Sequence, residues 1–236
     1  AICIRALDYS ETSQIVTFFT RATGKIDAIA KGSKRPKSAF DGPLEIFSYG
    51  KIVFSDSTKE KLAVLTEFQQ QPGFTHLAGN FFALNCCLFG AELLNNLTNE
   101  HDPHPELFDN FLQFLQNTNE IRDTLVLLIL FQLALLKEVG LQPILNACVN
   151  CKRRYGSNWP ESYFSSSANG LVCRDCENSF PDRIGMTQTA ANALSNLKSI
   201  ADADEKMLNE IEKVLVYHFT EILHRPPKMA KYILKR

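Results

Sequence analysis

Two closely spaced cysteine pairs constrain this chain more than any other feature. Cys148 and Cys151 form the first pair, and Cys173 and Cys176 form the second, with 21 residues between the pairs. Two intervening residues let both sulfurs of a pair turn towards one point, and four thiolates make a closed tetrahedral site for a structural zinc ion. The segment 148–183 is therefore predicted to be a small zinc-finger lobe with four cysteine ligands. A thiol–disulfide relay is the alternative, although that chemistry normally uses a single CxxC pair.

The composition is that of an ordinary globular protein. Of the 236 residues, 45% are hydrophobic and 22% are charged, and the net charge is -1. The sequence shows no secretory signal and no apolar stretch long enough to span a bilayer, so we expect no membrane contact. Seven cysteines, four of them at metal-binding spacing, fit a reducing compartment. We therefore expect a cytoplasmic, nucleoid-associated protein.

The first domain, residues 1–78, has the character of a small barrel. Short runs rich in β-branched and aromatic residues alternate with turn signals containing glycine, proline and aspartate. The predicted strands are Ile2–Leu7, Gln14–Arg21, Lys25–Ala30, Leu44–Phe54 and Leu62–Gln70. Five strands in fewer than 80 residues favour a five-stranded OB-fold barrel, and an SH3-like barrel is the alternative.

Helical spacing of apolar residues replaces the strand pattern on both sides of the cysteine lobe. Residues 79–147 and 184–236 are predicted to be the two parts of one helical bundle domain. Thr118 or Asn119 is expected to cap its third helix, which ends near Gly140. The predicted fold class is thus α+β and multi-domain: an N-terminal barrel and a helical bundle with the cysteine lobe inserted in it.

A basic loop follows the third predicted strand. Lys31, Lys34, Arg35 and Lys37 place four positive charges in seven residues without an acid. Such cations favour the phosphates of DNA, because neutralising phosphates releases counterions. Arg21 and Lys25, which flank the preceding hairpin, are expected to extend this patch. The alternative is an ordinary solvated surface loop.

The predicted strand 44–54 adds aromatic residues to this surface. Its alternation places Phe47, Tyr49 and Lys51 on the face that should meet solvent, where Tyr49 and Lys51 are predicted DNA contacts. Two aromatic rings beside a lysine would form a base-stacking platform. Two alternatives stay open: Phe47 and Tyr49 pack against the helical domain, or a bulge at Gly50 changes the alternation.

The C-terminal block 225–236 is also basic. It carries five cations and no acid, and Lys228, Lys231 and Lys235 would share one face of a short helix. Lys228 and Lys231 are therefore predicted to contact DNA. A basic terminal helix also interacts favourably with its own dipole, which is the alternative explanation.

No pattern in the sequence indicates an enzyme. The phosphate-binding loop, the dinucleotide fingerprint, the HExxH zinc motif and the GxSxG nucleophile motif are all missing from the sequence. A DNA-binding protein without catalytic activity explains the residues best. The alternatives are a protein–protein adaptor with a structural zinc site and no DNA contact, and a zinc or carboxylate hydrolase.

The order of these segments resembles the RecO family of bacterial DNA repair and recombination mediators. The resemblance covers nearly the whole chain and is most specific in the barrel. The residues that carry it are Asp8–Thr20, Gly24, Ala30–Ser38, Leu44–Glu45, Phe47, Leu65–Glu67, Pro105–Phe108, Gly140–Pro143 and Tyr163–Ser165, together with the four paired cysteines.

This resemblance implies an OB-fold followed by a helical domain with an inserted zinc finger. It further implies binding of single- and double-stranded DNA, annealing of complementary strands, and loading of RecA onto DNA coated by single-stranded-DNA-binding protein. RecR and single-stranded-DNA-binding protein would be direct partners and RecA an indirect one. The pocket for the tail of single-stranded-DNA-binding protein would lie in the helical domain. Some family members lack some or all of the cysteines, so the metal would not be the seat of activity.

Overall fold

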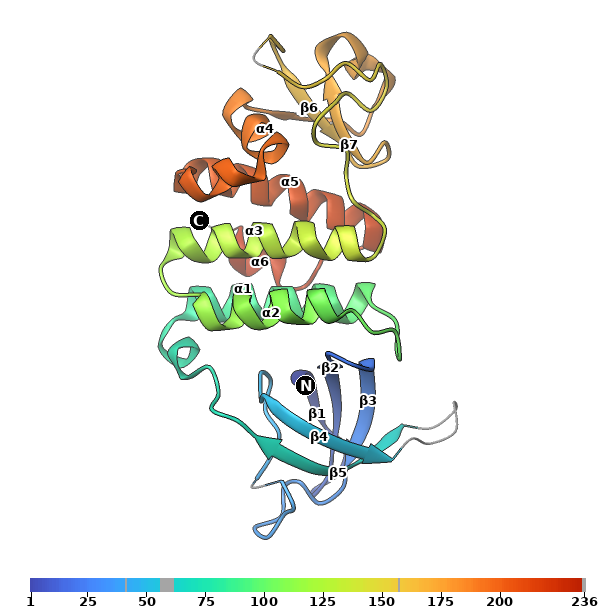
Figure 1. The fold of residues 1–236 in the computed structure, drawn as a ribbon, viewed down its shortest axis with the longest axis vertical. Helices are drawn as coiled ribbons and strands as arrows, with labels where there is room; N and C mark the ends of the chain where they lie inside the picture. The colour runs from blue at the N-terminus through green and yellow to red at the C-terminus, as the bar shows by residue number, and fades with distance from the viewer. Residues whose placement is uncertain (41, 56–61, 157, 235–236) are drawn as a thin grey trace. The chain divides into compact units, whose positions relative to one another are not determined.

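The computed structural model describes residues 1–40, 42–55, 62–156 and 158–234, which divide into two compact units (Figure 1). Unit 1 contains residues 1–78 and 91–116, and unit 2 contains residues 79–90 and 117–236. Helix α1, Phe81–Leu97, contributes residues to both units. The helical segment 91–116, which the sequence places with the bundle, thus groups with the N-terminal strands.

Unit 1 is built on a five-stranded sheet. Its strands are β1 (Ile2–Asp8), β2 (Gln14–Thr20), β3 (Gly24–Ala30), β4 (Gly50–Ser55) and β5 (Ala63–Gln70). The order in the sheet is β1-β2-β3-β5-β4, with β3 and β5 parallel and the other neighbours antiparallel. The predicted OB-fold is confirmed, although within the described residues no ladder between β4 and β1 closes the barrel.

Close backbone contacts join the two ends of this sheet. Ile2 forms an isolated bridge with Tyr49, and the amide of Gly50 donates to the carbonyl of Ala1 over 3.0 Å. A Cβ atom at Gly50 would lie 2.1 Å from the carbonyl oxygen of Gln69, so only glycine fits where the chain passes this strand.

Two apolar layers hold unit 1 together. Alternate residues of β3 (Ile26, Ala28 and Ala30) point into the core inside the sheet. On the other side, helix α2 (Pro105–Asn117) packs its aromatic side chains on the strands. The ring centroids of Phe19 and Phe108 lie 6.0 Å apart, a distance typical of a favourable aromatic pair.

Unit 2 is mainly helical. Helices α3 (Ile121–Glu138) and α5 (Glu205–Leu223) pack side by side, and both are buried along most of their length (Figure 1). Helices α4 (Gln188–Ser195) and α6 (Ala230–Ile233) and the first part of α1 also belong to this unit. Short 3-10 helices of the chain span Thr75–Gly79, Arg174–Ser179 and Leu197–Asp202.

Helix ends in unit 2 follow local sequence signals. After α3, Gly140 adopts a φ of 76°, its amide donates to the carbonyl of Lys137, and the amide of Leu141 donates to that of Leu136. This is a Schellman ending, as the glycine predicts. The predicted cap at Thr118 or Asn119 is wrong: α3 begins after Glu120, whose side chain makes no capping bond.

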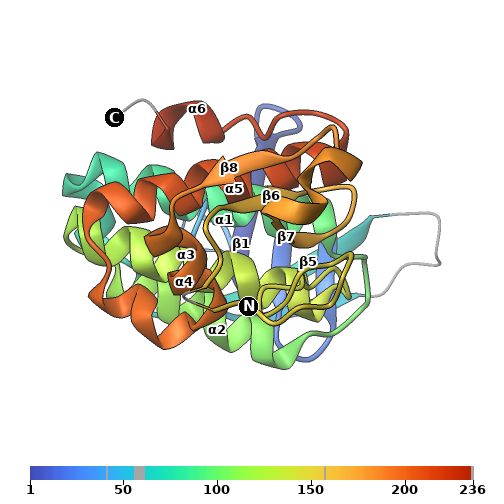
Figure 2. The ribbon, with the colours of Figure 1, turned by 90° about the horizontal axis from the view of Figure 1, so that it is seen from above.

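The cysteine lobe contains a small sheet of its own. Strand β6 (Ser162–Ser165) lies between β7 (Gly170–Cys173) and β8 (Ile184–Met186), and the three strands are visible together in Figure 2. Helices α3 and α5 precede and follow this sheet in the chain, so the predicted insertion between helices is confirmed.

Candidate nucleic-acid interface and metal centre

The basic loop after β3 is fixed at its root by buried hydrogen bonds. Ser33 has no exposed surface, and its hydroxyl donates to the side-chain oxygen of Gln14 over 2.9 Å. The same Gln14 oxygen accepts from the amide of Leu44 over 2.9 Å. A buried amide that joins two loops in this way restricts their motion, so the cations extend from a rigid base.

Three of the four loop cations are exposed. Lys31, Arg35 and Lys37 lie on the surface, whereas Lys34 is half-buried and its ammonium lies 2.7 Å from Asp8. An exposed ion pair of this kind contributes little to stability, but it neutralises part of the Lys34 charge. The positive charge available to phosphates therefore lies mainly on the three exposed side chains.

Arg21 and Lys25 have partners within unit 1. Arg21 forms a bidentate pair with Asp109, with distances of 3.0 Å from Nε to Oδ1 and 3.0 Å from Nη2 to Oδ2. The Lys25 ammonium donates to the carbonyls of Asn95 and Thr98, each over 2.7 Å, at the C-terminal end of α1. Burial lowers the pKa of Lys25, with nearby carboxylates opposing that shift. Contact of Arg21 and Lys25 with DNA stays a prediction. The structure shows that both side chains also bind other residues of unit 1.

The segment before β4 departs from the expected strand. The strand begins at Gly50 instead of Leu44, and Phe47 adopts a left-handed φ of 69°. Phe47 is buried, with its ring 6.4 Å from that of Phe111 on α2, so the packing alternative is confirmed for this residue. The alternation of buried and exposed side chains expected for a strand is not kept here: the consecutive residues Phe47 and Ser48 are both buried.

The remaining predicted contacts are spread over both units. Tyr49 is half-buried and its ring lies 6.2 Å from that of Phe74, whereas Lys51 is exposed on β4. In unit 2, Lys228 and Lys231 are exposed, and the predicted short helix is α6, whose Ile233 is fully buried. The prediction that Lys228 and Lys231 share one face of this helix is wrong, because α6 begins at Ala230 and Lys228 lies before it. Lys235 and Arg236 lie outside the described residues.

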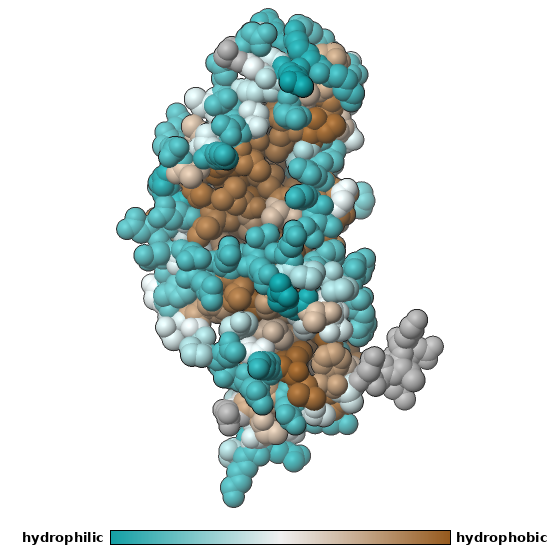
Figure 3. All heavy atoms as spheres, in the orientation of Figure 1, coloured by the Kyte–Doolittle hydropathy of each residue, from teal (hydrophilic) through white to brown (hydrophobic). Residues whose placement is uncertain are grey.

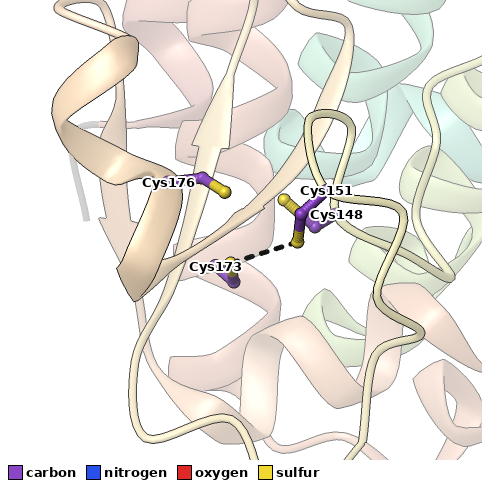
Figure 4. A group of neighbouring side chains, drawn as sticks. All are labelled: Cys148, Cys151, Cys173 and Cys176. Carbon is purple, nitrogen blue, oxygen red and sulfur yellow. Dashed lines mark hydrogen bonds between the residues drawn. The ribbon is translucent and has the colours of Figure 1, made fainter.

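The four paired cysteines converge in unit 2, as Figure 4 shows. Their sulfurs all lie within 4.8 Å of one another, and Cys151 alone among them is exposed. The Sγ atoms of Cys151 and Cys173 are 3.8 Å apart. That separation is far longer than a disulfide of about 2.0 Å. It equals the ~3.8 Å edge of a tetrahedron with Zn–S distances of about 2.3 Å. The cluster could therefore hold a metal ion.

Electrostatics at the cluster favour a bound cation. Burial opposes ionisation of Cys148, but hydrogen bonds from the backbone around Cys173, Cys151 and Asn150 outweigh it and lower the pKa to about 7. Burial raises the pKa of Cys173 to about 12. A dication bound between the four sulfurs would stabilise them as thiolates.

The structure contains an apolar pocket in unit 2 whose residues were not predicted from the sequence. Its volume is about 200 Å³, and its walls come from one face of α3, from the chain after that helix and from Leu197. Figure 3 shows hydrophobic residues gathered over this region. The lining residues are Leu130, Leu133, Ala134, Lys137, Gln142, Pro143, Leu145 and Leu197. The i, i+3, i+4, i+7 spacing of the α3 residues was a signal, but it is equally typical of a buried helix face.

Comparisons with known proteins cover both units. A family model described as "Recombination protein O N terminal" matches residues 1–71, and one described as "Recombination protein O C terminal" matches residues 78–230. The curated protein "DNA repair protein RecO" of Bacillus pumilus is 30% identical over 227 residues, which is 93% of this chain and 86% of the relative.

Two other curated relatives carry the same name. The protein of the same name from Bacillus subtilis is 34% identical over 82% of this chain and 73% of its own length. The one from Rhodopirellula baltica is 31% identical over 87% of this chain and 75% of its own length.

In the part of the chain that the structure describes, no helix combines the length and the apolar character needed to cross a membrane.

Proposed function

The chain belongs to the RecO family of DNA repair proteins, and we propose that in recombinational repair it anneals complementary DNA strands and helps to load RecA. Loading would take place on DNA coated by single-stranded-DNA-binding protein, with RecR as a further partner. The observation that carries this proposal is the rigidly anchored loop with exposed Lys31, Arg35 and Lys37.

The physical basis is charge neutralisation. Two DNA strands repel each other through their phosphates, and cations that bind both strands lower this repulsion while releasing condensed counterions. Complementary bases can then find their register without any bond being made or broken by the protein. We therefore propose a non-enzymatic mechanism, in which the protein holds strands and transfers one of them to a partner.

We propose that the cysteine cluster binds structural zinc. Four sulfur ligands complete a tetrahedral site and leave no position for a reactive water. The metal would stabilise the lobe, because a segment of this size has little apolar core and metal binding contributes directly to its folding. Cys148, Cys151, Cys173 and Cys176 would be the ligands, and their role would be to hold the lobe's fold.

We assign the apolar pocket of unit 2 to the tail of single-stranded-DNA-binding protein. The family resemblance implies such a pocket in the helical domain, and this one lies between α3 and the segment that follows it. Its apolar walls would bury hydrophobic side chains of a peptide, and Lys137 would pair with a carboxylate. Leu133→Asp should abolish binding of a peptide with the tail sequence, as measured by fluorescence anisotropy.

Charge reversal in the loop tests DNA binding. The triple variant Lys31→Glu, Arg35→Glu, Lys37→Glu should weaken binding to a labelled oligonucleotide. The slope of log K against log[salt] should become shallower by about 2, at about 0.7 per cation lost on single strands. The matched control reverses Lys198, Lys206 and Lys213, three exposed lysines of unit 2. An unchanged slope in the loop variant would contradict the assignment.

The pocket also supports a second candidate function. A protein–protein adaptor with a structural metal site needs an apolar recognition surface and no cationic one, and the pocket supplies the former. The two functions differ in one measurement. If the unmodified protein fails to bind oligonucleotides even at low salt, the DNA-binding proposal is wrong and the adaptor remains.

A further inference from the structure

An exposed tyrosine and an exposed leucine lie at the end of the edge strand β1. Leu7 and Tyr9 are 45% and 63% exposed, respectively. Successive side chains of a strand point to opposite faces, so Leu7 points the same way as Arg5, which is also exposed, and Tyr9 follows directly after the strand. Single exposed apolar residues are common on protein surfaces, but a row formed by a cation, a leucine and a tyrosine is less ordinary.

The tyrosine is held beside the basic loop. Backbone hydrogen bonds close the turn 9–13, because the amide of Tyr9 donates to the carbonyl of Ser13 over 3.0 Å. The loop is bonded to this turn twice: the amide of Lys34 donates to the carbonyl of Thr12 over 3.1 Å, and that of Gly32 to the Ser13 hydroxyl over 3.2 Å. The two segments therefore form one surface.

A second contact fixes the neighbour of the tyrosine. The carboxylate of Asp8, next to Tyr9 in the chain, lies 2.7 Å from the ammonium of Lys34. The position of Tyr9 relative to the loop is therefore set by contacts on both sides of it in the sequence. No ring contact involves Tyr9 within the described residues, whereas Tyr49, the aromatic residue expected to stack on bases, already packs against Phe74.

Charge distribution orients a strand on this surface. Asp8 lies just before the turn and the exposed Glu11 lies within it, so phosphates are disfavoured there, while Lys31, Arg35 and Lys37 attract them to the loop. A strand whose backbone follows the loop would turn its bases towards the turn. An aromatic ring at that place offers its face to an unpaired base, but gains nothing from a base already stacked and paired in a duplex.

We propose that Tyr9 is a stacking platform for an unpaired base, with Leu7 beside it, and that it gives this surface a preference for single-stranded over duplex DNA. This inference rests on the proposed DNA-binding function and deepens it. The loop cations supply affinity for any phosphate backbone, and the tyrosine adds the part of the affinity that distinguishes single strands from duplex.

Substitution of Tyr9 tests the proposal. Tyr9→Ala and Tyr9→Phe are titrated by anisotropy against three labelled ligands of equal length: oligothymidylate, an abasic oligonucleotide and a duplex. We expect Tyr9→Ala to weaken binding of oligothymidylate by roughly 5- to 150-fold, the usual range for loss of one base–aromatic stack. Binding of the abasic strand and the duplex should stay within about twofold, and Tyr9→Phe should behave as the unmodified protein does.

Controls separate this inference from the function on which it rests. Phe81→Ala removes an aromatic side chain that is 79% exposed in unit 2 and should change none of the affinities. If the unmodified protein binds all three ligands with normal salt dependence while Tyr9→Ala loses nothing, or loses equally on all three, the stacking role is wrong and DNA binding stands. If the unmodified protein binds none of them, the proposed function itself fails.

Discussion

Glu212 lies in the middle of α5 with no exposed surface, and it faces an equally buried Gln132 on α3. The Gln132 amide donates to Oε1 of Glu212 over 2.8 Å. Within the described residues, Oε2 of Glu212 and Oε1 of Gln132 have no hydrogen-bond partner. A neutral carboxyl group carries a proton that it can donate to the Gln132 oxygen. An ionised carboxylate has no such proton, so Oε2 of Glu212 and Oε1 of Gln132 would both stay unpaired. We predict that Glu212 is protonated in the folded protein below about pH 7 and that Glu212→Gln removes the contribution of this group to the pH dependence of stability.

The magnitude follows from the pKa. Burial raises the pKa of Glu212 from 4.5 to about 7, against the opposing hydrogen bond from Gln132. Between these values the folded state keeps a proton that the unfolded state releases, so the stability from the neutral pair, complete below pH 4.5, is lost as pH rises towards 7. At ~1.4 kcal/mol per pKa unit, this loss is about 3 kcal/mol over the whole window and about 2 kcal/mol between about pH 5 and 7.5.

A second buried group on the same helix hides this effect. Burial lowers the pKa of His218 to about 4, and Ser166 lies 2.7 Å from its Nδ1. Here the unfolded state binds the extra proton, so stability rises with pH between about 4 and 6.5. The gain between about pH 5 and 7.5 is again about 2 kcal/mol. The two contributions nearly cancel, and the unmodified protein should show little pH dependence from this pair.

The assay compares variants at each pH. Urea unfolding of unit 2 can be followed by the fluorescence of Trp159, the only tryptophan, which is buried in the cysteine lobe. Glu212→Gln keeps a neutral hydrogen-bonding group and exposes the His218 effect, so its stability should rise by about 2 kcal/mol from about pH 5 to 7.5. Both proteins keep the same cysteines, so effects of metal binding cancel in the difference. Glu205→Gln, exposed on the same helix, is the matched control.

One result would refute the reasoning. If the stability difference between Glu212→Gln and the unmodified protein is the same at both ends of this pH range, Glu212 does not change its protonation on unfolding there. The interpretation of the unpaired oxygens would then be wrong.

Two further predictions concern the metal centre and Lys25. Metal analysis should find one zinc ion per chain. The variant Cys173→Ser should lose the zinc ion and melt at a lower temperature, because metal binding contributes to folding. Folded native protein without metal would contradict the zinc assignment. Lys25→Met should destabilise unit 1 by about 2–3 kcal/mol in chemical denaturation, since two charge-assisted hydrogen bonds disappear, whereas exposed Lys37→Met should not. Full stability with weaker DNA binding would instead make Lys25 a DNA contact.

Local sequence signals predicted the helices and the cysteine cluster better than they predicted contacts between segments far apart in the sequence. The helices and the four-cysteine cluster follow from apolar periodicity, from the glycine ending of α3 and from cysteine spacing, which depend on residues close in the chain. The segment 44–49 did not follow from alternation, because its conformation is set by contacts with residues far away in the sequence. Phe47 packs on Phe111 of α2, and its left-handed backbone is maintained by that packing and by bonds to β1.

Prediction of the DNA-contact residues from the sequence is limited in the same way. The sequence reveals that Lys25, Lys34 and Arg21 are cationic, but each has a partner 26 to 88 residues away. Such pairings cannot be recognised without the fold. The exposed Tyr9 was likewise overlooked, although it lies in the motif that carries the family resemblance, because its exposure depends on how the turn and the loop meet.

The division of the chain has a consequence for biosynthesis. Unit 1 needs residues 91–116, which follow a stretch belonging to unit 2. As the ribosome releases the polypeptide from its N-terminal end, the five strands emerge before α2 and before the carbonyls that bind Lys25. The nascent strands therefore lack an essential packing partner until about forty more amino acids have been added. A recombinant fragment that stops at residue 78 would expose the same aromatic face to solvent and is a poor choice for isolating the OB-fold.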